Sequence, residues 1–437
     1  MGGVVDDEVL LARAYLSRVG DPGSIPLWLF VRSVGPVEAA ASLRAGRGDD
    51  DALAATAARR ADAHPESDLE AAHRRGVRLV VPESSEWPHF AFAALERAGA
   101  ARATSYAAGD RTRRESGEPM PPLALWVRGP GELATVGTRS VGIVGARAAT
   151  AYGEHVTAEL AYGLARRNVT VVSGGAYGID AAAHRAALAA RGTTILVSAG
   201  GLDRPYPPGN STLFERVAES GLLVSESPPG CAPHRPRFLT RNRVIAALST
   251  GVVVVEAASR SGAANTAGHA RTLGRSLMAV PGPVTSAMSV GCHDLLRHDT
   301  DPALLVTSVD DVLAVVGSMG EGLRGEPVHD FGRGSGRGDG GPGGGGPGCG
   351  GPGDGGVGDR ARPGDIRVEL DRLDPTARRV FEGLPARRFA RPAEVATRSG
   401  VSALEVIRAL PALDLAGLIE NRNDGYRIAA RLRAAGR

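Results

Sequence analysis

The sequence contains no lysine, so all 51 of its basic residues are arginines. Acidic residues number 48, and the net charge of +3 is too small to give the whole molecule a strong field. Anions must therefore be bound by local clusters of side chains. Each cationic contact with a phosphate must come from an arginine, whose guanidinium group binds bidentately, or from a charged histidine.

Other scarce features exclude whole classes of protein. No apolar run approaches the roughly 20 residues that span a bilayer, and the N-terminus lacks the basic segment of a secretory signal peptide. The three cysteines, Cys231, Cys292 and Cys349, form no Cys-x-x-Cys pair and no even-numbered framework. They are typical of reduced thiols, so we expect a cytoplasmic protein without membrane association. His293 beside Cys292 lacks the further ligands of a metal site, and none is inferred.

Between residues 141 and 280, six short apolar runs alternate with stretches of helix length. The runs are continuous in apolar character, which indicates strands buried on both faces. Helices between them imply right-handed crossovers. The sequence therefore predicts an α/β fold with a Rossmann-like, doubly wound, mostly parallel sheet. The predicted strands are residues 141–144, 169–172, 194–197, 222–224, 252–255 and 277–280.

The rest of the chain divides around this core. Helical spacing predicts a small helical domain over residues 8–65, and the core extends over 70–320. Residues 325–365 are rich in Gly and Pro and predict a disordered linker. An RNA-binding arginine–glycine tract is the alternative, but arginine is sparse there. Residues 366–430 predict three helices (375–384, 392–399 and 404–418) and a hairpin at 418–428, the outline of a winged helix.

The most informative run is residues 238–248, which begins with Phe238 and continues with Arg241, Asn242 and Arg243 ahead of a buried-looking helix. Guanidinium groups bind phosphates, and a nearby ring offers a stacking face for a base. This pattern favours binding of single-stranded nucleic acid over catalysis. Arg237 is a weaker candidate, because a surface charge would look the same.

Gly-rich turns follow the predicted strands, at the end of the sheet where doubly wound proteins bind ligands. The first turn precedes a helix, so its backbone N–H groups could bind an anion, and Arg147 adds a guanidinium group. A tight turn with a surface arginine explains these residues equally well. The spacing of its glycines departs from that of a dinucleotide site. The second turn contains Ser173, Gly174, Gly175 and Gly178, which would let a backbone approach phosphate closely.

Several neighbouring residues have structural explanations that we prefer. Asp180 suits a helix cap and His184 a packed helix position, and the two could also bond each other as i,i+4 neighbours. Tyr206 is either a stacking ring or the anchor of its loop. No Walker A motif, activated nucleophile or cofactor motif is found, so neither catalysis nor a cofactor is predicted.

Taken together, these motifs resemble the DNA processing protein A family (DprA, also called Smf). The resemblance covers some 140 residues in order. It comprises residues 142–147, 173–180, 183–184, 201–203, 206–207, 225–230, 238–246, 254–262 and 280–282. The segment before them resembles the family's sterile-alpha-motif-like N-terminal domain, and the tail resembles the winged helix that some members carry.

The resemblance implies a Rossmann-like core that binds single-stranded DNA, commonly as a homodimer. It also implies protection of incoming DNA and loading of the recombinase RecA in natural transformation. Carried over by motif, the contacts with phosphates and bases would come from Arg147, Phe238, Arg241 and Arg243. Gly174, Gly175 and Gly178 would shape the pocket.

Two alternatives stay open. A phosphoribohydrolase on a related sheet would use Glu256 and the Ser261-Gly262 loop on a ribose phosphate, but the Pro-Gly-Gly-x-Gly-Thr-x-x-Glu signature of those enzymes is absent. A DNA-repair role without transformation would use the same binding chemistry, so the sequence does not separate the two.

Overall fold

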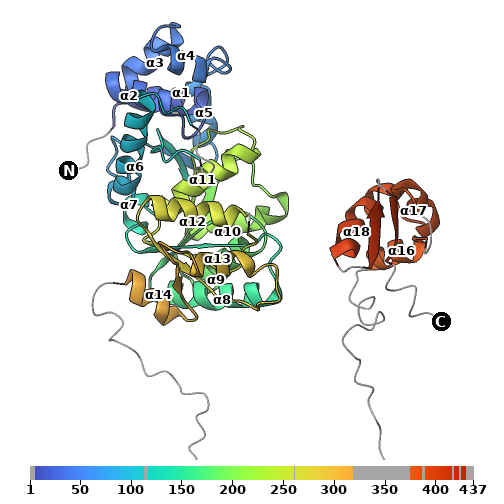
Figure 1. The fold of residues 1–437 in the computed structure, drawn as a ribbon. Helices are drawn as coiled ribbons and strands as arrows, with labels where there is room; N and C mark the ends of the chain where they lie inside the picture. The colour runs from blue at the N-terminus through green and yellow to red at the C-terminus, as the bar shows by residue number, and fades with distance from the viewer. Residues whose placement is uncertain are drawn as a thin grey trace, which may run out of the picture. The chain divides into compact units, whose positions relative to one another are not determined.

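The structure is a computed structural model that describes residues 5–112, 117–259, 261–317, 375–385, 389–415, 418–422 and 425–429. The chain divides into two compact units, residues 1–333 and 334–437 (Figure 1). The linker predicted at 325–365 lies outside the described residues. Within the described ranges, no helix is long and apolar enough to cross a membrane.

In the first unit, the described residues form a nine-stranded sheet in the order β1-β2-β6-β5-β4-β3-β7-β8-β9. The strands from β6 to β9 pair in parallel, while β1 and β2 continue the sheet in antiparallel pairing. The predicted doubly wound, mostly parallel sheet is confirmed. The strands are β1 (Val77–Val80), β2 (Leu125–Arg128), β3 (Ser140–Val144), β4 (Thr170–Gly174), β5 (Thr194–Ser198), β6 (Leu222–Ser225), β7 (Gly251–Val254), β8 (Ser276–Ala279) and β9 (Leu304–Leu305).

The six predicted strands coincide with β3 to β8 apart from their end residues. Every residue of β3, β4, β5, β6 and β7 is buried, as continuous apolar runs require when helices cover both faces of a sheet. The β1–β2 pair and β9 extend the sheet beyond these predicted strands.

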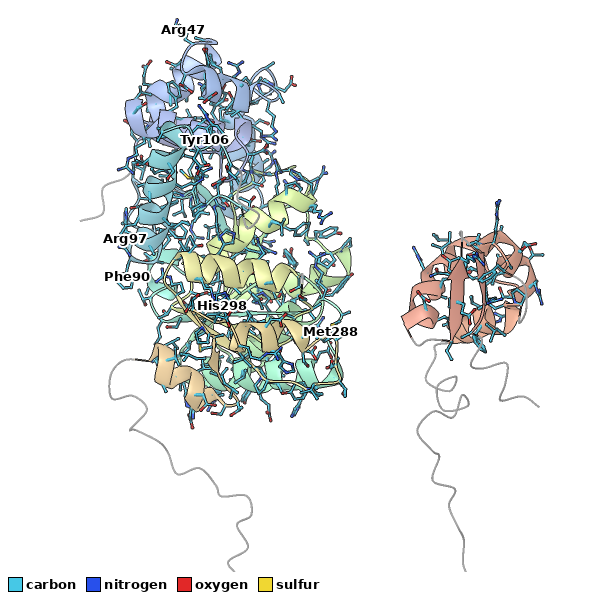
Figure 2. The ribbon with its side chains drawn as sticks, in the orientation of Figure 1. Arg47, Phe90, Arg97, Tyr106, Met288 and His298 are labelled. Atoms are coloured by element: carbon cyan, nitrogen blue, oxygen red, sulfur yellow. The ribbon has the colours of Figure 1, made fainter. Side chains whose placement is uncertain are left out.

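Helices form a layer on each side of the sheet (Figure 1). One face is covered by α6 (His89–Ala107), α11 (Arg235–Ala247), α12 (Gly262–Thr272) and α13 (Val290–Leu296). The other is covered by α8 (Ala151–Arg166), α9 (Ile179–Ala189), α10 (Ser211–Ser220) and α14 (Val309–Val316). Side chains fill the space between layers (Figure 2), although Phe90 at the start of α6 stays 81% exposed. Two short elements, α7 (Leu133–Val136) and η1 (Pro208–Asn210), lie in connections.

The strand order reverses between β3 and β7. From β3 the chain winds outward through β4, β5 and β6, and it returns to lay β7, β8 and β9 on the other side. The loops that leave the carboxyl ends of β3 and β7 therefore diverge and open a crevice at this switch point.

Five helices precede β1, namely α1 (Asp7–Val19), α2 (Ile25–Val34), α3 (Pro36–Arg44), α4 (Asp50–Thr56) and α5 (Pro65–His73). The first four share a core that includes Tyr15, Leu16, Leu27 and Leu43. Ala14 of α1 and Ala72 of α5 pack into the cluster around Trp126 of the sheet. The boundary predicted between residues 65 and 70 falls inside α5, and a separate sterile-alpha-motif-like domain stays a prediction.

The described residues of the second unit contain α16 (Pro375–Gly383), α17 (Pro392–Ser399), α18 (Ala403–Leu415) and a hairpin of β10 (Ile419–Arg422) and β11 (Gly425–Ile428). Val380, Val395, Val406 and Leu413 are fully buried between them. The elements follow the order that the sequence predicts. Assignment of this unit to the winged helices stays a prediction.

Candidate functional site

A groove of about 1520 Å³ opens at the switch point. Its walls are residues 144–147 after β3, residues 259 and 261–266 around the start of α12, and the first half of α11. Pockets for single small molecules measure roughly 300–1,000 Å³. The groove is therefore large enough for a chain of several linked groups.

An arginine and a carboxylate meet at the bottom of the groove. Arg241 is 8% exposed, and it donates hydrogen bonds to Asn242 Oδ1 (3.1 Å) and to the carbonyl of Val197 in β5. Burial lowers the pKa of Arg241 to about 10, and the charge of Asp180 opposes that shift. Burial also raises the pKa of Asp180, against the charges of Arg241 and Arg147. A cation held here with one nearby carboxylate is suited to receive an anion.

The glycine beneath this pair makes the approach possible. A Cβ on Gly174 would lie 2.6 Å from Asp180 Oδ2 and 2.8 Å from both terminal nitrogens of Arg241. Any side chain at this position would displace one of the two charged groups.

An aromatic wall stands above this floor. The ring of Phe238 lies 5.5 Å from that of Tyr206, with the two planes inclined by 52°. The guanidinium carbon of Arg147 lies 5.3 Å from the centre of the Phe238 ring. Arg147 is exposed and Tyr206 is 46% exposed, so rings and charge face the groove together. This combination offers a stacking surface beside a free guanidinium group.

The structure corrects the prediction for Arg243. Its side chain is fully buried and does not line the groove. The guanidinium group pairs bidentately with Glu226 (2.5 and 2.6 Å) and donates to the carbonyls of Met120 (2.7 Å) and Thr240 (2.9 Å). With its donors engaged by protein acceptors, Arg243 has a structural role and is not carried into the candidate site.

Asn242 lies at the groove with its amide group engaged. It accepts from Arg241 and donates to Asn265 Oδ1 (3.0 Å) and to the Gly262 carbonyl (3.3 Å). It therefore ties α11 to the start of α12 and positions Arg241.

The second Gly-rich turn shapes the groove from below. Ser173, Gly174 and Gly175 are buried, and the Ser173 hydroxyl donates to the Ile143 carbonyl (2.6 Å). Direct approach of a phosphate to these three residues, as the sequence suggests, is blocked by the protein around them. Gly178 has φ +72°, and a Cβ there would lie 2.3 Å from the carbonyl oxygen of Ala146. Only glycine lets this turn pack against the loop that carries Arg147.

His184 is a packed helix residue, as we prefer from the sequence. It is fully buried, and its ring nitrogens lie 2.7 Å from Thr194 Oγ1 and 2.8 Å from the Gly174 carbonyl oxygen. Burial lowers the pKa of His184 to about 4, so the ring is neutral near pH 7. Its partners are therefore other than Asp180, and Asp180 instead faces Arg241.

Two basic residues of the groove escape the sequence prediction. Arg235 and His234 line the groove at the start of α11. Arg235 precedes Phe238 by three residues, and such neighbours share one face of a helix. That spacing could have identified Arg235 from the sequence. Arg237 lies off this face, is 9% exposed and faces the helical segment α1–α5.

Glu256, the carboxylate of the hydrolase alternative, binds Thr150, the N-cap residue of α8. It is 2% exposed and accepts from the backbone N–H of Thr150 (2.9 Å) and from the Thr150 hydroxyl (2.6 Å). A carboxylate in these bonds at a helix N-terminus is stabilised in place.

Fold and groove together define a doubly wound α/β protein with an arginine- and aromatic-lined crevice at its switch point. The family model for DNA recombination-mediator protein A matches residues 110–317. A protein of Mycobacterium tuberculosis (strain H37Rv), named as a DNA processing protein DprA, is 46% identical over 423 residues, which are 97% of this chain and 95% of that protein. The chain therefore belongs to the DNA recombination-mediator protein A (DprA/Smf) family.

More distant relatives match the core. The DNA processing protein DprA of Streptococcus pneumoniae is 40% identical over 193 residues, which are 44% of this chain and 66% of that protein. A solved structure of DprA from the same species superposes with a TM-score of 0.53 at 27% identity, covering 71% of this chain and 98% of that one.

Proposed function

We propose that the protein binds single-stranded DNA in the switch-point groove and acts as a mediator of DNA recombination. The observation that carries the proposal is the packing of Phe238 with Arg147 and Tyr206 above the Arg241–Asp180 floor. The names of the family and of its relatives, which describe DNA processing and recombination mediation, support the same role.

Phosphates would be bound by Arg147 and Arg235 on the walls and by Arg241 at the floor. All three line the groove, and guanidinium groups suit phosphate oxygens better than any other cationic side chain. The net charge of +3 gives little long-range attraction, so this local cluster must supply the electrostatic part of the affinity. Binding should weaken with salt. The logarithm of the binding constant should fall linearly with the logarithm of the salt concentration, with a slope of about 0.7 for each neutralised phosphate (the salt slope).

Bases would stack on Phe238 and Tyr206. Every base has a π-face, so the affinity should tolerate changes of sequence, and each stacked base contributes about 1–3 kcal/mol. Single strands present unpaired bases to such rings, whereas a duplex keeps its bases stacked on one another.

The finer parts of the proposal follow from the family. We propose a homodimer that is cytoplasmic, lacks catalytic activity, protects incoming strands and passes them to RecA in natural transformation. A repair role without transformation is the alternative. A deletion strain, measured for transformation and for survival of DNA damage, separates the two.

The test is the anisotropy of labelled oligo-dT across a salt series, with wild type compared with Arg147→Ala and Phe238→Ala. Both side chains are accessible, so neither change disturbs the core. We expect Phe238→Ala to weaken binding about 5- to 150-fold at all salt concentrations, as loss of one stacked base implies. Arg147→Ala should lower the salt slope by about 0.7.

Matched controls lie on α8, on the opposite face of the sheet. Tyr162 is 47% exposed and Arg166 is exposed, so Tyr162→Ala and Arg166→Ala remove a ring and a charge without touching the groove. If the control variants weaken binding of oligo-dT as much as the groove variants do, the DNA binds outside the groove. Folded wild type that fails to bind at low salt would refute the proposal, and release of free base from nucleoside monophosphates would then establish the hydrolase alternative.

A further inference from the structure

The helical segment α1–α5 reaches the rim of the groove through one carboxylate. Asp21, in the turn between α1 and α2, lies 2.6 Å from a terminal nitrogen of Arg59 and 3.5 Å from one of Arg237 on α11. Arg59 also donates to the carbonyl of Val19 (3.3 Å). We name Asp21, Arg59, His234 and Arg237 the rim cluster, since His234 lines the groove itself.

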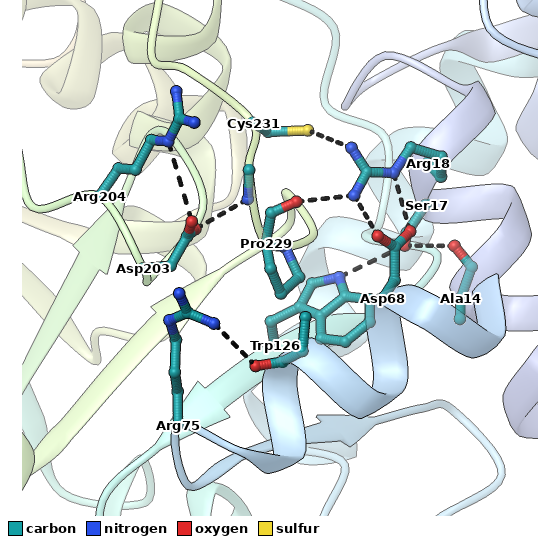
Figure 3. Close-up of polar contacts among 12 residues, drawn as sticks. Ala14, Ser17, Arg18, Asp68, Arg75, Trp126, Asp203, Arg204, Pro229 and Cys231 are labelled. Carbon is teal, nitrogen blue, oxygen red and sulfur yellow. Dashed lines mark hydrogen bonds and ion pairs between the residues drawn. The ribbon is translucent and has the colours of Figure 1, made fainter. Parts of the chain in front are cut away.

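The position of this turn is fixed by a neighbouring anchor. Arg18, on the last turn of α1, pairs with Asp68 of α5 and donates to the Pro229 carbonyl (2.7 Å) and to Cys231 Sγ (3.3 Å), as Figure 3 shows. The Pro229–Cys231 loop leads directly into α11. The helical segment is therefore bound to the chain that enters the groove helix, and Asp21 follows three residues after the anchor.

Electrostatic interaction joins the members of the rim cluster. Partial burial lowers the pKa of His234, the charges of Arg237 and Arg59 lower it further, and Asp21 acts in the opposite direction. Two guanidinium groups thus share one carboxylate, which leaves the rim cluster positively charged.

Arg237 is incompletely satisfied in this arrangement. It is 9% exposed, its terminal nitrogen donates to the Ala232 carbonyl at 3.3 Å, and its buried Nε has no hydrogen-bond partner among the residues that the structure describes. Arg243, six residues later, makes four hydrogen bonds of 2.5 to 2.9 Å. A buried donor without an acceptor is costly, so Arg237 gains more from a new acceptor than Arg243 would.

We propose that a DNA strand leaving the groove at His234 continues over the rim cluster, where a phosphate replaces Asp21 as the partner of Arg59 and Arg237. This proposal rests on the proposed binding of single-stranded DNA and adds the helical segment to the DNA path. The Asp21 carboxylate is 57% exposed, and an ion pair with an exposed carboxylate contributes little stability, so giving up this carboxylate for a phosphate costs little. Asp21 then acts as a competing anion that limits affinity for long strands.

The test compares oligo-dT of about 5 nucleotides, enough to occupy the groove, with oligo-dT of about 20 nucleotides, which extends past the rim. Wild type, Arg59→Ala and Asp21→Asn of the full chain are titrated across a salt series. Arg59→Ala should lower the salt slope for the long strand by about 0.7 and weaken its binding about 5-fold near 0.1 M salt, with short-strand affinity unchanged. Asp21→Asn should strengthen long-strand binding and steepen its slope.

A purely structural ion pair gives a different result. In that case Asp21→Asn would lower the melting temperature and leave the long-strand affinity equal or weaker, which would overturn the proposal. Equal effects of Arg59→Ala on both strand lengths would overturn it too. The Arg166→Ala variant serves as the matched control for loss of one exposed arginine. Failure of wild type to bind either length would refute the proposed function itself, and the two failures are thereby distinguished.

Discussion

Replacement of Arg243 by methionine should destabilise the first unit while leaving its groove intact. The guanidinium group makes two bonds with Glu226 and two with carbonyl oxygens, and its side chain is fully buried. Glu226 is itself only 10% exposed in its side chain. In Arg243→Met this carboxylate would remain buried without its cation.

The size of the expected loss of stability is set by Glu226, which is left buried without its cation. Removal of one member of a buried ion pair costs about 3–5 kcal/mol. Dividing by a urea m-value near 3 kcal/mol/M gives a decrease of about 1–2 M in the urea midpoint. The three tryptophans, Trp28, Trp87 and Trp126, all lie in the first unit, so fluorescence reports on that unit alone.

A second variant separates the buried charge from the loss of packing. In Arg243→Met/Glu226→Leu both charges are gone, and well-packed apolar replacements of buried pairs are often neutral. We expect most of the lost stability to return. Arg147→Met, at an exposed position, should stay within about 0.5 kcal/mol of wild type.

If Arg243→Met unfolds at the wild-type midpoint and loses its affinity for oligo-dT, Arg243 contacts DNA and its buried pair is dispensable. If the variant is less stable but the folded fraction binds as wild type does, the structural role is established.

Three further predictions concern other parts of the first unit. Gly178→Ala should cost about 1–3 kcal/mol, because a Cβ at φ +72° would lie 2.3 Å from a carbonyl oxygen; thermal unfolding against Gly262→Ala, where a Cβ meets no atom within 4 Å, checks this. The His184 pKa is depressed from 6.5 to about 4, so the unfolded state binds the proton first and stability falls as the pH drops from 6.5 to 4. The loss in the free energy of unfolding approaches about 3 kcal/mol. Urea titrations at several pH values should show that His184→Gln lacks this decrease. The variant keeps Asp180, whose raised pKa changes the stability in the opposite direction. Burial raises the pKa of the Cys292 thiol to about 12, so iodoacetamide on the native protein should modify Cys231 well before Cys292 by mass spectrometry, and equal rates would contradict the burial.

Much of the fold could be predicted from the sequence because its signals are local. Continuous β-branched runs such as 252–255 can be buried on both faces only in a sheet covered by helices. The carboxyl ends of such strands then define one edge, which gathers Arg147 near the residues of α11. The pattern therefore predicts the end of the sheet at which the groove lies, whereas the strand reversal that opens the groove is known only from the strand order of the structure.

The roles of neighbouring side chains were decided by tertiary structure. Arg241 and Arg243 are two residues apart on α11, and positions at that spacing point to different sides of a helix. One reaches the groove floor beside Asp180, while the other is enclosed by Glu226 and the Met120 carbonyl. Those partners come from distant parts of the chain. The sequence therefore determined that guanidinium groups gather on α11, and only the folded chain determined which of them an outside phosphate can reach.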